Sequence, residues 1–114
     1  MRTTKDIGDF YEKITRDHYT KNGHTILAEN YRFGKSEIDF ISLKENTTCF
    51  IEVKFRKSKS YGNSEEMVSD AQMERILEAA EDFILKNNIT TNIRFDIVAI
   101  NKNHEIEVFE DAFG

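Results

Sequence analysis

Three strand-like runs follow one another with only short turns between them, and this succession constrains the fold of the chain more than any other feature. The runs extend from Thr25 to Phe33, from Glu37 to Leu43 and from Thr48 to Arg56. The turns between them are Gly34-Lys35-Ser36 and the polar stretch Lys44 to Thr47. Turns of this length join antiparallel neighbours, whereas a parallel neighbour needs a longer crossover. The sequence therefore predicts an antiparallel three-stranded unit in the first half of the chain.

Two helical patterns flank this unit. The first extends from Thr3 to Asn22 and ends before Gly23, and its apolar stripe consists of Ile7, Phe10, Tyr11, Ile14 and His18. The second extends from about Ser69 to Lys86, and its stripe consists of Met73, Ile76, Leu77, Ala80 and Ile84. Ser69 and Gln72 have the spacing of a capping box at the start of this second helix. We therefore expect two amphipathic helices.

Two further strands are predicted near the carboxyl end, from Arg94 to Ile100 and from Glu105 to Phe109, joined by the turn Asn101 to His104. The helix before them supplies the length that a crossover to a parallel strand needs. The expected architecture is an α/β fold in the order α-β-β-β-α-β-β, with a mixed sheet flanked by helices. A chain of 114 residues is long enough for one core and too short for two, so residues 1–114 are expected to form a single domain.

Composition excludes several classes of protein. Hydrophobic residues make up 39% of the chain and charged residues 32%, which is typical of globular rather than disordered proteins. No apolar run reaches the roughly 18 residues of a membrane helix, and the amino terminus lacks the apolar core of a signal peptide. We therefore expect a cytoplasmic protein without a membrane partner. The single cysteine, Cys49, lies in an apolar strand and is expected to be a core residue rather than a nucleophile.

The net charge of −5 is unevenly distributed. Residues 1–60 carry twelve Lys and Arg against nine Asp and Glu, whereas residues 61–114 carry four against twelve. Overall acidity argues against a polyanionic partner, but a locally basic surface leaves room for one. Arg56, Lys57 and Lys59 follow the third strand and are candidates for contacting a nucleic-acid backbone. For Lys57 and Lys59 the alternative is an ordinary solvated loop.

Glu52 and Lys54 form the most informative local motif. Side chains alternate between the faces of a strand, so these two share one face while Ile51, Val53 and Phe55 share the other. Burying two charges side by side costs free energy unless they serve each other or a metal ion. A chain with thirteen Glu and ten Lys contains about one Glu-x-Lys by chance. The motif therefore indicates a functional site only if neighbouring residues fit the same chemistry.

Asp39, in the preceding strand, is such a neighbouring residue. If the two runs pair across their short turn, Asp39 lies opposite Glu52 within about one residue of register. Adjacent carboxylates repel unless a hard divalent cation lies between them, and oxygen ligands suit Mg²⁺ or Mn²⁺. Lys54 would add a group that orients water or stabilises charge on phosphorus, which indicates metal-assisted phosphodiester hydrolysis. The alternative is a solvated salt-bridge ladder, worth roughly a few tenths of a kcal/mol per pair.

An ordered set of motifs spans nearly the whole chain. It comprises Gly8 with Glu12, Gly23-His24-Thr25-Ile26-Leu27, Asn30 with Arg32, Ser36-Glu37-Ile38-Asp39-Phe40-Ile41, Phe50-Ile51-Glu52-Val53-Lys54-Phe55-Arg56, Arg75 with Ala79-Ala80, Arg94-Phe95-Asp96-Ile97-Val98 and Asp111-Ala112-Phe113. Together they resemble the YraN family of bacterial proteins. That family is similar to the archaeal Holliday-junction resolvases and belongs to the PD-(D/E)xK nuclease superfamily. The resemblance implies the restriction-endonuclease-like fold, which has an αβββαβ core.

The resemblance also implies roles for individual residues. Asp39 and Glu52 would bind Mg²⁺ or Mn²⁺, and the backbone carbonyl of Val53 would complete the metal shell. Lys54 would be the catalytic lysine. Glu12, on the first helix, would be an accessory acid that helps to hold a second or water-bridged ion. DNA is the implied partner, with branched or junction DNA as the implied substrate and a homodimer as the implied assembly.

Three positions depart from the family pattern. Ser36 and Tyr11 stand where glycines usually precede the Glu-Ile-Asp motif and the helix-1 glutamate. Gln72 stands where a lysine is usual near the start of the second helix, so it can hydrogen-bond a phosphate or water but cannot supply a charge. Because Asp39, Glu52 and Lys54 are intact, the leading expectation is a divalent-metal-dependent DNA endonuclease. The alternatives are a nucleic-acid-binding or protein-interaction module without turnover, and a scaffold whose acidic second helix docks a basic partner.

Overall fold

The computed structural model describes residues 4–56 and 68–113, with the backbone alone for residues 4–7. Along the chain lie α1 (Thr4–Lys21), β1 (Thr25–Phe33), β2 (Ser36–Lys44), β3 (Thr47–Arg56), α2 (Asp70–Lys86), β4 (Asn92–Asn101) and β5 (Ile106–Phe113). This order confirms the predicted succession of helices and strands.

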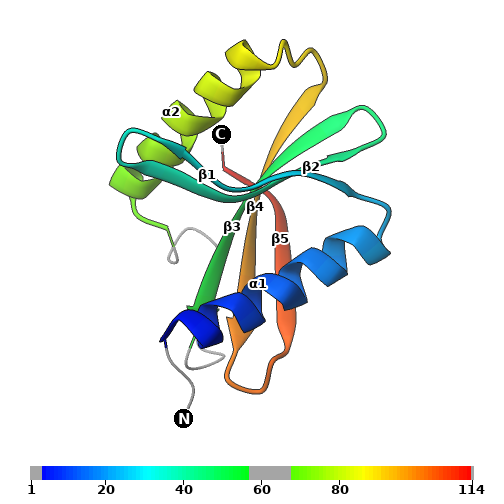
Figure 1. Cartoon of the computed structure of the whole chain (residues 1–114), viewed down its shortest axis with the longest axis vertical. Helices are drawn as coiled ribbons and strands as arrows, with labels where there is room; N and C mark the ends of the chain where they lie inside the picture. Colours follow the sequence, from blue (N-terminus) through cyan, green and yellow to red (C-terminus); the bar gives the residue numbers. More distant parts are fainter. Residues whose placement is uncertain (1–3, 57–67, 114) are drawn as a thin grey trace.

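The strands form one five-stranded mixed sheet in the order β1-β2-β3-β4-β5. β3 and β4 are parallel, and the other neighbouring pairs are antiparallel. α2 lies between the two parallel strands in the chain and supplies the predicted crossover. Figure 1 shows a strongly twisted sheet with α1 on one side and α2 on the other. The architecture is therefore the expected α/β fold with a restriction-endonuclease-like core, to which β5 adds an edge strand.

Each helix covers one face of the sheet. On the α2 face, Phe50 lies in one apolar cluster with Ile76 of the helix. On the α1 face, Ile51 lies in a second cluster with Tyr19 of the helix. Neighbouring residues of β3 thus face opposite helices, as the alternation of a strand requires. The even-numbered residues of β3 face α2, and this places the charged motif of the strand beneath that helix.

Local signals set the ends of several elements. The Ser69 hydroxyl accepts a hydrogen bond from the backbone N–H of Gln72 at 3.2 Å, so Ser69 is the N-cap of α2 as predicted. Gly23 follows α1 with a φ of 90°, and Gly34 lies in the β1–β2 turn with a φ of 61°. Glycine enters this region without a steric penalty, so both residues suit the turns that they form.

Three details of the predicted elements are wrong. Leu77, expected in the buried stripe of α2, is 40% exposed, because the side of the helix that packs on the sheet is formed by Ile76, Ala79, Ala80 and Phe83. The buried stripe of α1 ends with Tyr19, which is 2% exposed, rather than with His18, because the tyrosine ring packs into the core while its hydroxyl finds a buried acceptor. β5 extends to Phe113 rather than Phe109. The strand continues because Asp111 adopts a φ of 51° at an irregularity in the β4–β5 register, after which pairing resumes.

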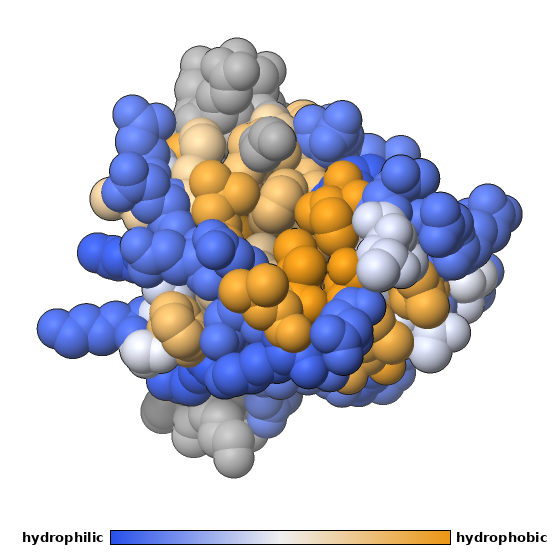
Figure 2. All heavy atoms as spheres, turned by 90° about the horizontal axis from the view of Figure 1, so that it is seen from above, coloured by the Kyte–Doolittle hydropathy of each residue, from blue (hydrophilic) through white to orange (hydrophobic). Residues whose placement is uncertain are grey.

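Some large apolar side chains remain exposed. They are Leu27, Phe33, Phe55, Leu77, Leu85 and Ile93. Figure 2, which looks onto the upper end of the molecule in Figure 1, shows an apolar area ringed by hydrophilic residues. Within the two described segments, neither helix combines the length and the apolar character needed to cross a membrane.

Candidate active site

The candidate site lies where β2 and β3 separate, a place that we call the fork. The two strands pair as far as Phe40 and Ile51, and Figure 1 shows the β1–β2 hairpin bending away from β3. One residue beyond this last pair, the side chains of Asp39 and Glu52 are in contact, which agrees with the predicted pairing to within one residue of register. The Asp39 side chain takes the place of a backbone partner there, because its Oδ2 accepts a hydrogen bond from the Val53 N–H at 2.8 Å. The end of strand pairing thus creates the site.

Glu52 has the most perturbed pKa among the acids of the fork. Its carboxyl group lies within hydrogen-bonding distance of the Asp39 carboxyl group, and both residues are half-buried. Burial raises the pKa of Glu52 well above its ordinary value, contact with Asp39 raises it further, and Lys54 opposes both effects. The pair therefore holds a proton, or another cation, more tightly than an isolated carboxylate in water does.

Lys54 is held in place by α2. Its Nζ donates a hydrogen bond to Oε1 of Gln72 at 2.9 Å, and both side chains are half-buried. Gln72 lies in the first turn of α2, so the helix positions the ammonium group beside the strand. A solvated salt-bridge ladder does not describe this arrangement, because the face is covered by a helix and Lys54 bonds to an amide.

A hollow of about 190 Å³ opens on the α2 side of the fork and is lined by Lys35, Glu37, Asp39, Glu52, Gln72, Arg75 and Ile76. Lys35 and Arg75 were not predicted from sequence as site residues; both are exposed and bring positive charge to this hollow. Arg75 follows Gln72 by three positions and so shares its side of the helix, and this spacing was enough to predict that Arg75 lies near the site. Lys35 had no such signal, because only the bend of the β1–β2 hairpin brings it to the fork.

A second hollow, of about 200 Å³, opens on the α1 side and is lined by Gly8, Tyr11, Glu12, Asp39, Val53 and Phe55. Glu12 is half-buried there. Burial and the neighbouring Asp9 raise its pKa, a hydrogen bond with the side chain of Asn30 lowers it, and Asp39 raises it again. α1 therefore turns Glu12 toward Asp39, from the side opposite Lys54.

The oxygen atoms of the fork fit a hard divalent cation. Asp39 and Glu52 place two carboxyl groups in contact, and the carbonyl of Val53 leaves the strand at the same edge as the N–H that bonds to Asp39. Across residues 4–56 and 68–113, no three His, Cys, Asp or Glu side chains are grouped closely enough to hold one ion. Glu12 therefore does not join the two fork acids in one ligand set. Water would occupy the remaining positions, as it commonly does around Mg²⁺.

The three cations expected to contact nucleic acid are not equivalent. Arg56 is only 11% exposed, and its Nη2 pairs with Glu107 of β5 at 2.7 Å. Contact with a phosphate would require this ion pair to open, so Arg56 is poorly placed for the role. Lys57 and Lys59 lie outside the described residues.

Asp96 of β4 is another buried carboxylate, on the α1 face of the sheet. It accepts hydrogen bonds from the Tyr19 hydroxyl at 2.8 Å, from Nε and Nη2 of Arg94 at 2.9 Å each, and from the Asp111 N–H at 3.1 Å. The bidentate pair raises the pKa of Arg94. Because the protein itself supplies these donors, Asp96 has a structural role that its place in the sequence pattern did not reveal.

Comparison with known proteins agrees with the resemblance noted in the sequence. Residues 11–100 match the family described as uncharacterised protein family UPF0102. The chain is 37% identical over 116 residues to a UPF0102 protein of Flavobacterium psychrophilum, an alignment that covers 99% of this chain and 98% of the relative. It is 36% identical over 115 residues to one of Clostridium perfringens, covering 96% and 94%. A UPF0102 protein of Cytophaga hutchinsonii is 46% identical over 80 residues, covering 70% and 71%.

The span matched by the family model contains the described site residues of the fork. Glu12 lies near its start, and Asp39, Glu52, Lys54 and Gln72 lie well inside it. The alignments with the relatives from Flavobacterium and Clostridium extend over nearly the full length of both chains, so the likeness is not limited to one motif. This chain therefore belongs to the UPF0102 family, which is the YraN family of the PD-(D/E)xK nuclease superfamily.

Proposed function

We propose that this protein is a divalent-metal-dependent endonuclease that hydrolyses phosphodiester bonds in DNA. The observation that carries the proposal is the fork, where the carboxyl groups of Asp39 and Glu52 lie in contact and Lys54 projects from the same face of β3 as Glu52. Repulsion within such a half-buried pair costs stability, and a bound cation would offset that cost. An arrangement that lowers the stability of the free protein is typical of a functional site.

Each residue of the fork has a distinct part in this proposal. Asp39, Glu52 and the carbonyl oxygen of Val53 would hold the ion, Mg²⁺ or Mn²⁺. When bound, the ion supplies Lewis-acid stabilisation of the negative charge that develops on the phosphoryl oxygens. Glu12 would help to hold a second or water-bridged ion, in keeping with its position across Asp39 from Lys54.

Lys54 and Gln72 act on the water and on the phosphate. The ammonium group of Lys54 orients the attacking water and stabilises the charge that develops on the phosphorus centre. Gln72 is a positioning residue, because its Oε1 accepts the Lys54 hydrogen bond at 2.9 Å and limits the movement of the long side chain. Its amide NH₂ group remains able to donate to a phosphate oxygen.

DNA is the proposed substrate, and its phosphates would contact the basic rim of the α2-side hollow. Lys35 and Arg75 supply the positive charge there, which a protein with a net charge of −5 needs locally to bind a polyanion. Selectivity for branched or junction DNA, and assembly as a homodimer, follow from the similarity of the family to the Holliday-junction resolvases. Lys35 and Arg75 thus replace Arg56 as the cations that we expect to position the DNA backbone.

The test is cleavage of labelled branched, flapped, single-stranded and duplex DNA with Mg²⁺, with Mn²⁺ or with EDTA. We expect cleavage that needs the metal and that falls by at least roughly 100-fold in Asp39→Asn, since loss of an outer-shell partner alone can cost up to that factor. Lys54→Ala should also lose cleavage while it still binds DNA. Asp17→Asn, on the exposed side of α1, is the matched control and should cleave as the wild type does.

Two other outcomes carry different conclusions. Cleavage that survives Asp39→Asn or Lys54→Ala would remove the proposed mechanism and would point to a contaminating nuclease. Binding of DNA by the wild type without cleavage under any of these ionic conditions would instead assign the protein to the nucleic-acid-binding modules that keep this fold without turnover.

A further inference from the structure

The α1-side hollow differs in chemistry from the α2-side hollow, although Asp39 lines both. The α2 side has three acids in its lining, but Lys35 and Arg75 offset their charge and a metal ion on Asp39 and Glu52 would offset the rest, so this side suits phosphate. The lining that the described residues give the α1 side contains no basic residue and combines two carboxylates with two aromatic rings. Carboxylates repel a phosphate, so the two hollows suit different parts of one substrate.

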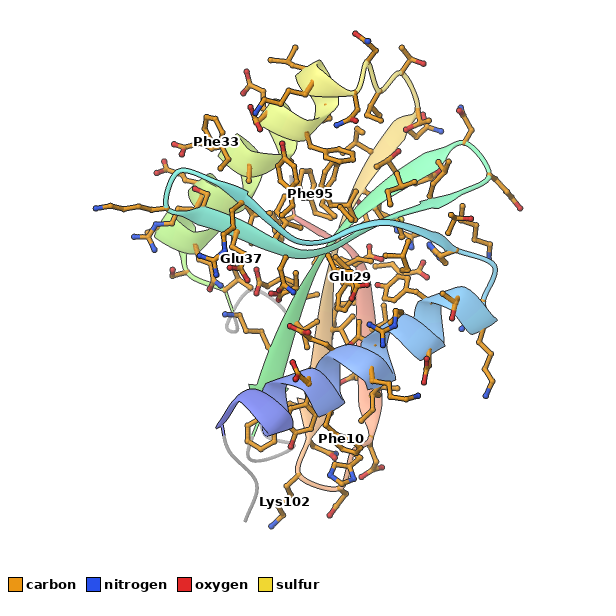
Figure 3. All side chains as sticks on the ribbon, in the orientation of Figure 1. Phe10, Glu29, Phe33, Glu37, Phe95 and Lys102 are labelled. Atoms are coloured by element: carbon orange, nitrogen blue, oxygen red, sulfur yellow. The ribbon has the colours of Figure 1, made fainter. Side chains whose placement is uncertain are left out.

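The aromatic rings of the α1-side hollow form a ready stacking surface. The rings of Tyr11 and Phe55 are nearly parallel, with centroids 5.3 Å apart and an angle of 25° between their planes. Phe55 remains 45% exposed although it packs on Tyr11. Phe10 contacts His104 edge-on at 4.8 Å, and Figure 3 shows it at the end of the molecule where Lys102 lies. Phe10 and His104 both also contact the ring of Tyr11, so packing of α1 against the β4–β5 turn helps to hold the aromatic pair in place.

Gly8 also lines the α1-side hollow, and its lack of a side chain leaves space next to the rings. Glycine inside a helix lowers stability relative to alanine, so its presence in α1 needs a reason. The backbone does not supply one, because Gly8 is not among the residues with positive φ. Packing against the described part of the chain does not supply one either, because a Cβ at this position would meet none of its atoms within 4 Å. The space beside Tyr11 and Glu12 is thus kept free of a side chain.

We propose that the α1-side hollow is a stacking subsite for an unpaired base next to the scissile phosphate. A base outside a duplex presents its flat face, and proteins bind such faces by stacking them on aromatic rings. A neutral base does not meet the repulsion that Glu12 and Asp39 exert on a phosphate. The volume of about 200 Å³ lies below the roughly 300 Å³ at which sites for drug-sized ligands begin, so it suits one ring system.

The substrate class follows from this subsite, and the inference rests on the proposed nuclease function. A base within a duplex would have to leave its stack to reach Phe55, which costs free energy, whereas an unpaired base pays no such cost. The preferred substrates are therefore single strands, or branched DNA with unpaired nucleotides at the cleavage point.

The test compares binding of a fluorescein-labelled oligothymidylate with binding of a duplex of the same length, by anisotropy with Ca²⁺ as the ion. We expect Phe55→Ala to raise the Kd for the single strand by about 5- to 150-fold, the range measured when a stacking ring is removed, with less than about a twofold change for the duplex. Phe55→Trp should restore single-strand binding. Phe33→Ala is the matched control, since Phe33 is 43% exposed on another surface and should bind as the wild type does.

A second measurement needs no variant. A 2-aminopurine base placed in the single strand should lose fluorescence on binding to the wild type, because stacking on an aromatic ring quenches it. Three results would each overturn the stacking subsite while leaving the nuclease proposal intact. The fluorescence could stay unquenched, Phe55→Ala could bind the single strand with unchanged affinity, or Phe55→Ala could lose as much affinity for the duplex as for the single strand. Conversion of a dimer to a monomer by Phe55→Ala, with unchanged affinity for DNA, would show that the rings contact a second copy of the chain and would also overturn it. A wild type that neither binds nor cleaves DNA would overturn both proposals.

Discussion

Asp96 and the pair of acids in the fork are all shielded from water, yet their surroundings differ. Asp96 is fully buried and accepts hydrogen bonds from a tyrosine, an arginine and a backbone N–H. Asp39 accepts one backbone hydrogen bond, and its other contact is the carboxyl group of Glu52. The ammonium group of Lys54, on the same face of β3 as Glu52, donates its hydrogen bond to Gln72.

Asp96 is a carboxylate that stabilises the fold, whereas the carboxyl groups of the fork are arranged to bind a cation. A buried charge that is fully paired stabilises its neighbourhood only while each partner is present, and removal of one partner is costly. A pair of acids in contact opposes folding until a cation arrives. Removal of a carboxylate should therefore change the free energy of unfolding with opposite signs at the two places.

The largest effect is expected at Asp96. Replacement by alanine leaves the Arg94 guanidinium and the Tyr19 hydroxyl without their shared acceptor, and loss of a buried ionic partner costs about 3–5 kcal/mol. The free energy of unfolding, measured with urea, should fall by that amount, a large share of the roughly 5–15 kcal/mol of a typical domain. Tyr19→Phe removes one hydrogen bond and should cost about 1–2 kcal/mol. A loss below about 1 kcal/mol in Asp96→Ala would show that its network does not carry the fold.

Metal binding should produce the next effect, and only at the fork. Mn²⁺ or Mg²⁺ at about 100 times its Kd should stabilise the wild type by about 2.7 kcal/mol, seen as a rise in Tm. Asp39→Asn should lose this response, because it removes a charged oxygen donor and leaves shape unchanged. Asp17→Asn is the control and should respond as the wild type does. An equal rise in Tm for both variants would place the ion elsewhere.

Glu52→Gln should stabilise the metal-free protein by about 1 kcal/mol, the worth of one hydrogen bond. The amide keeps the shape of the side chain and is neutral without taking up a proton, and its NH₂ group can donate to the Asp39 carboxylate. Urea unfolding in EDTA measures the effect, and addition of Mn²⁺ should then stabilise this variant less than the wild type. Destabilisation in EDTA would mean that the fork acids support the fold, which would remove the contrast with Asp96.

The smallest effect is a pH dependence on the α1 face. His24 is buried and its Nδ1 lies 2.9 Å from the Ser42 hydroxyl; burial lowers its pKa below the ordinary 6.5, and Arg94 and Lys44 lower it further. The unfolded chain then binds the proton more readily, so the stability from neutral His24 is complete above about pH 6.5 and is lost as pH falls through the lowered pKa.

Urea unfolding at pH 7.5 and pH 5.5 measures this dependence, with Glu52→Gln as the background. Glu52 has a raised pKa, so its contribution has the opposite sign and is lost as pH rises. In that background, a protein with His24 should lose more stability on acidification than one with His24→Gln. Equal losses would show that His24 does not differ in protonation between the folded and unfolded states.

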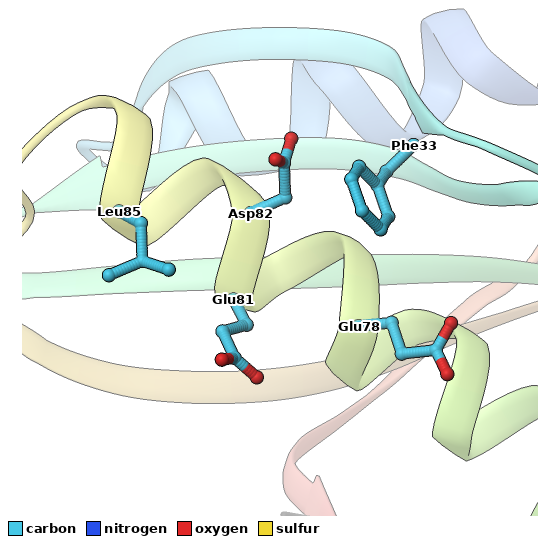
Figure 4. A pocket seen from close by; sticks show the side chains of 5 residues that line it. All are labelled: Phe33, Glu78, Glu81, Asp82 and Leu85. Atoms are coloured by element: carbon cyan, nitrogen blue, oxygen red, sulfur yellow. The ribbon is translucent and has the colours of Figure 1, made fainter.

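The acidic side of α2 shows why a charge pattern alone says little about binding. Figure 4 shows Phe33, Glu78, Glu81, Asp82 and Leu85 around a shallow hollow on this side. Asp82 accepts a hydrogen bond from the Tyr31 hydroxyl and pairs with Lys86 at 3.1 Å, and these contacts lower its pKa. Asp82, an acid of the helix expected to dock a basic partner, thus anchors α2 to β1.

The candidate site was predictable from sequence only where strand geometry decides it. Alternation put Glu52 and Lys54 on one face, and the short β2–β3 turn set Asp39 opposite Glu52. Lys35 escaped prediction because it depends on how far the hairpin bends away from β3. Arg75 shares a helix side with Gln72, but only the docking of α2 on the sheet brings that side to the fork.

The amino-acid sequence by itself determined the succession of elements, the caps and turns, and the register of the central hairpin, because these depend on residues a few positions apart. The tertiary structure decided which carboxylates are paired with donors and which are not. Tyr19 and Asp96 are 77 residues apart, and Lys54 and Gln72 belong to different elements, so no local pattern reports either hydrogen bond. The balance of charge at each acid is a sum over neighbours that only the packed sheet and helices bring together.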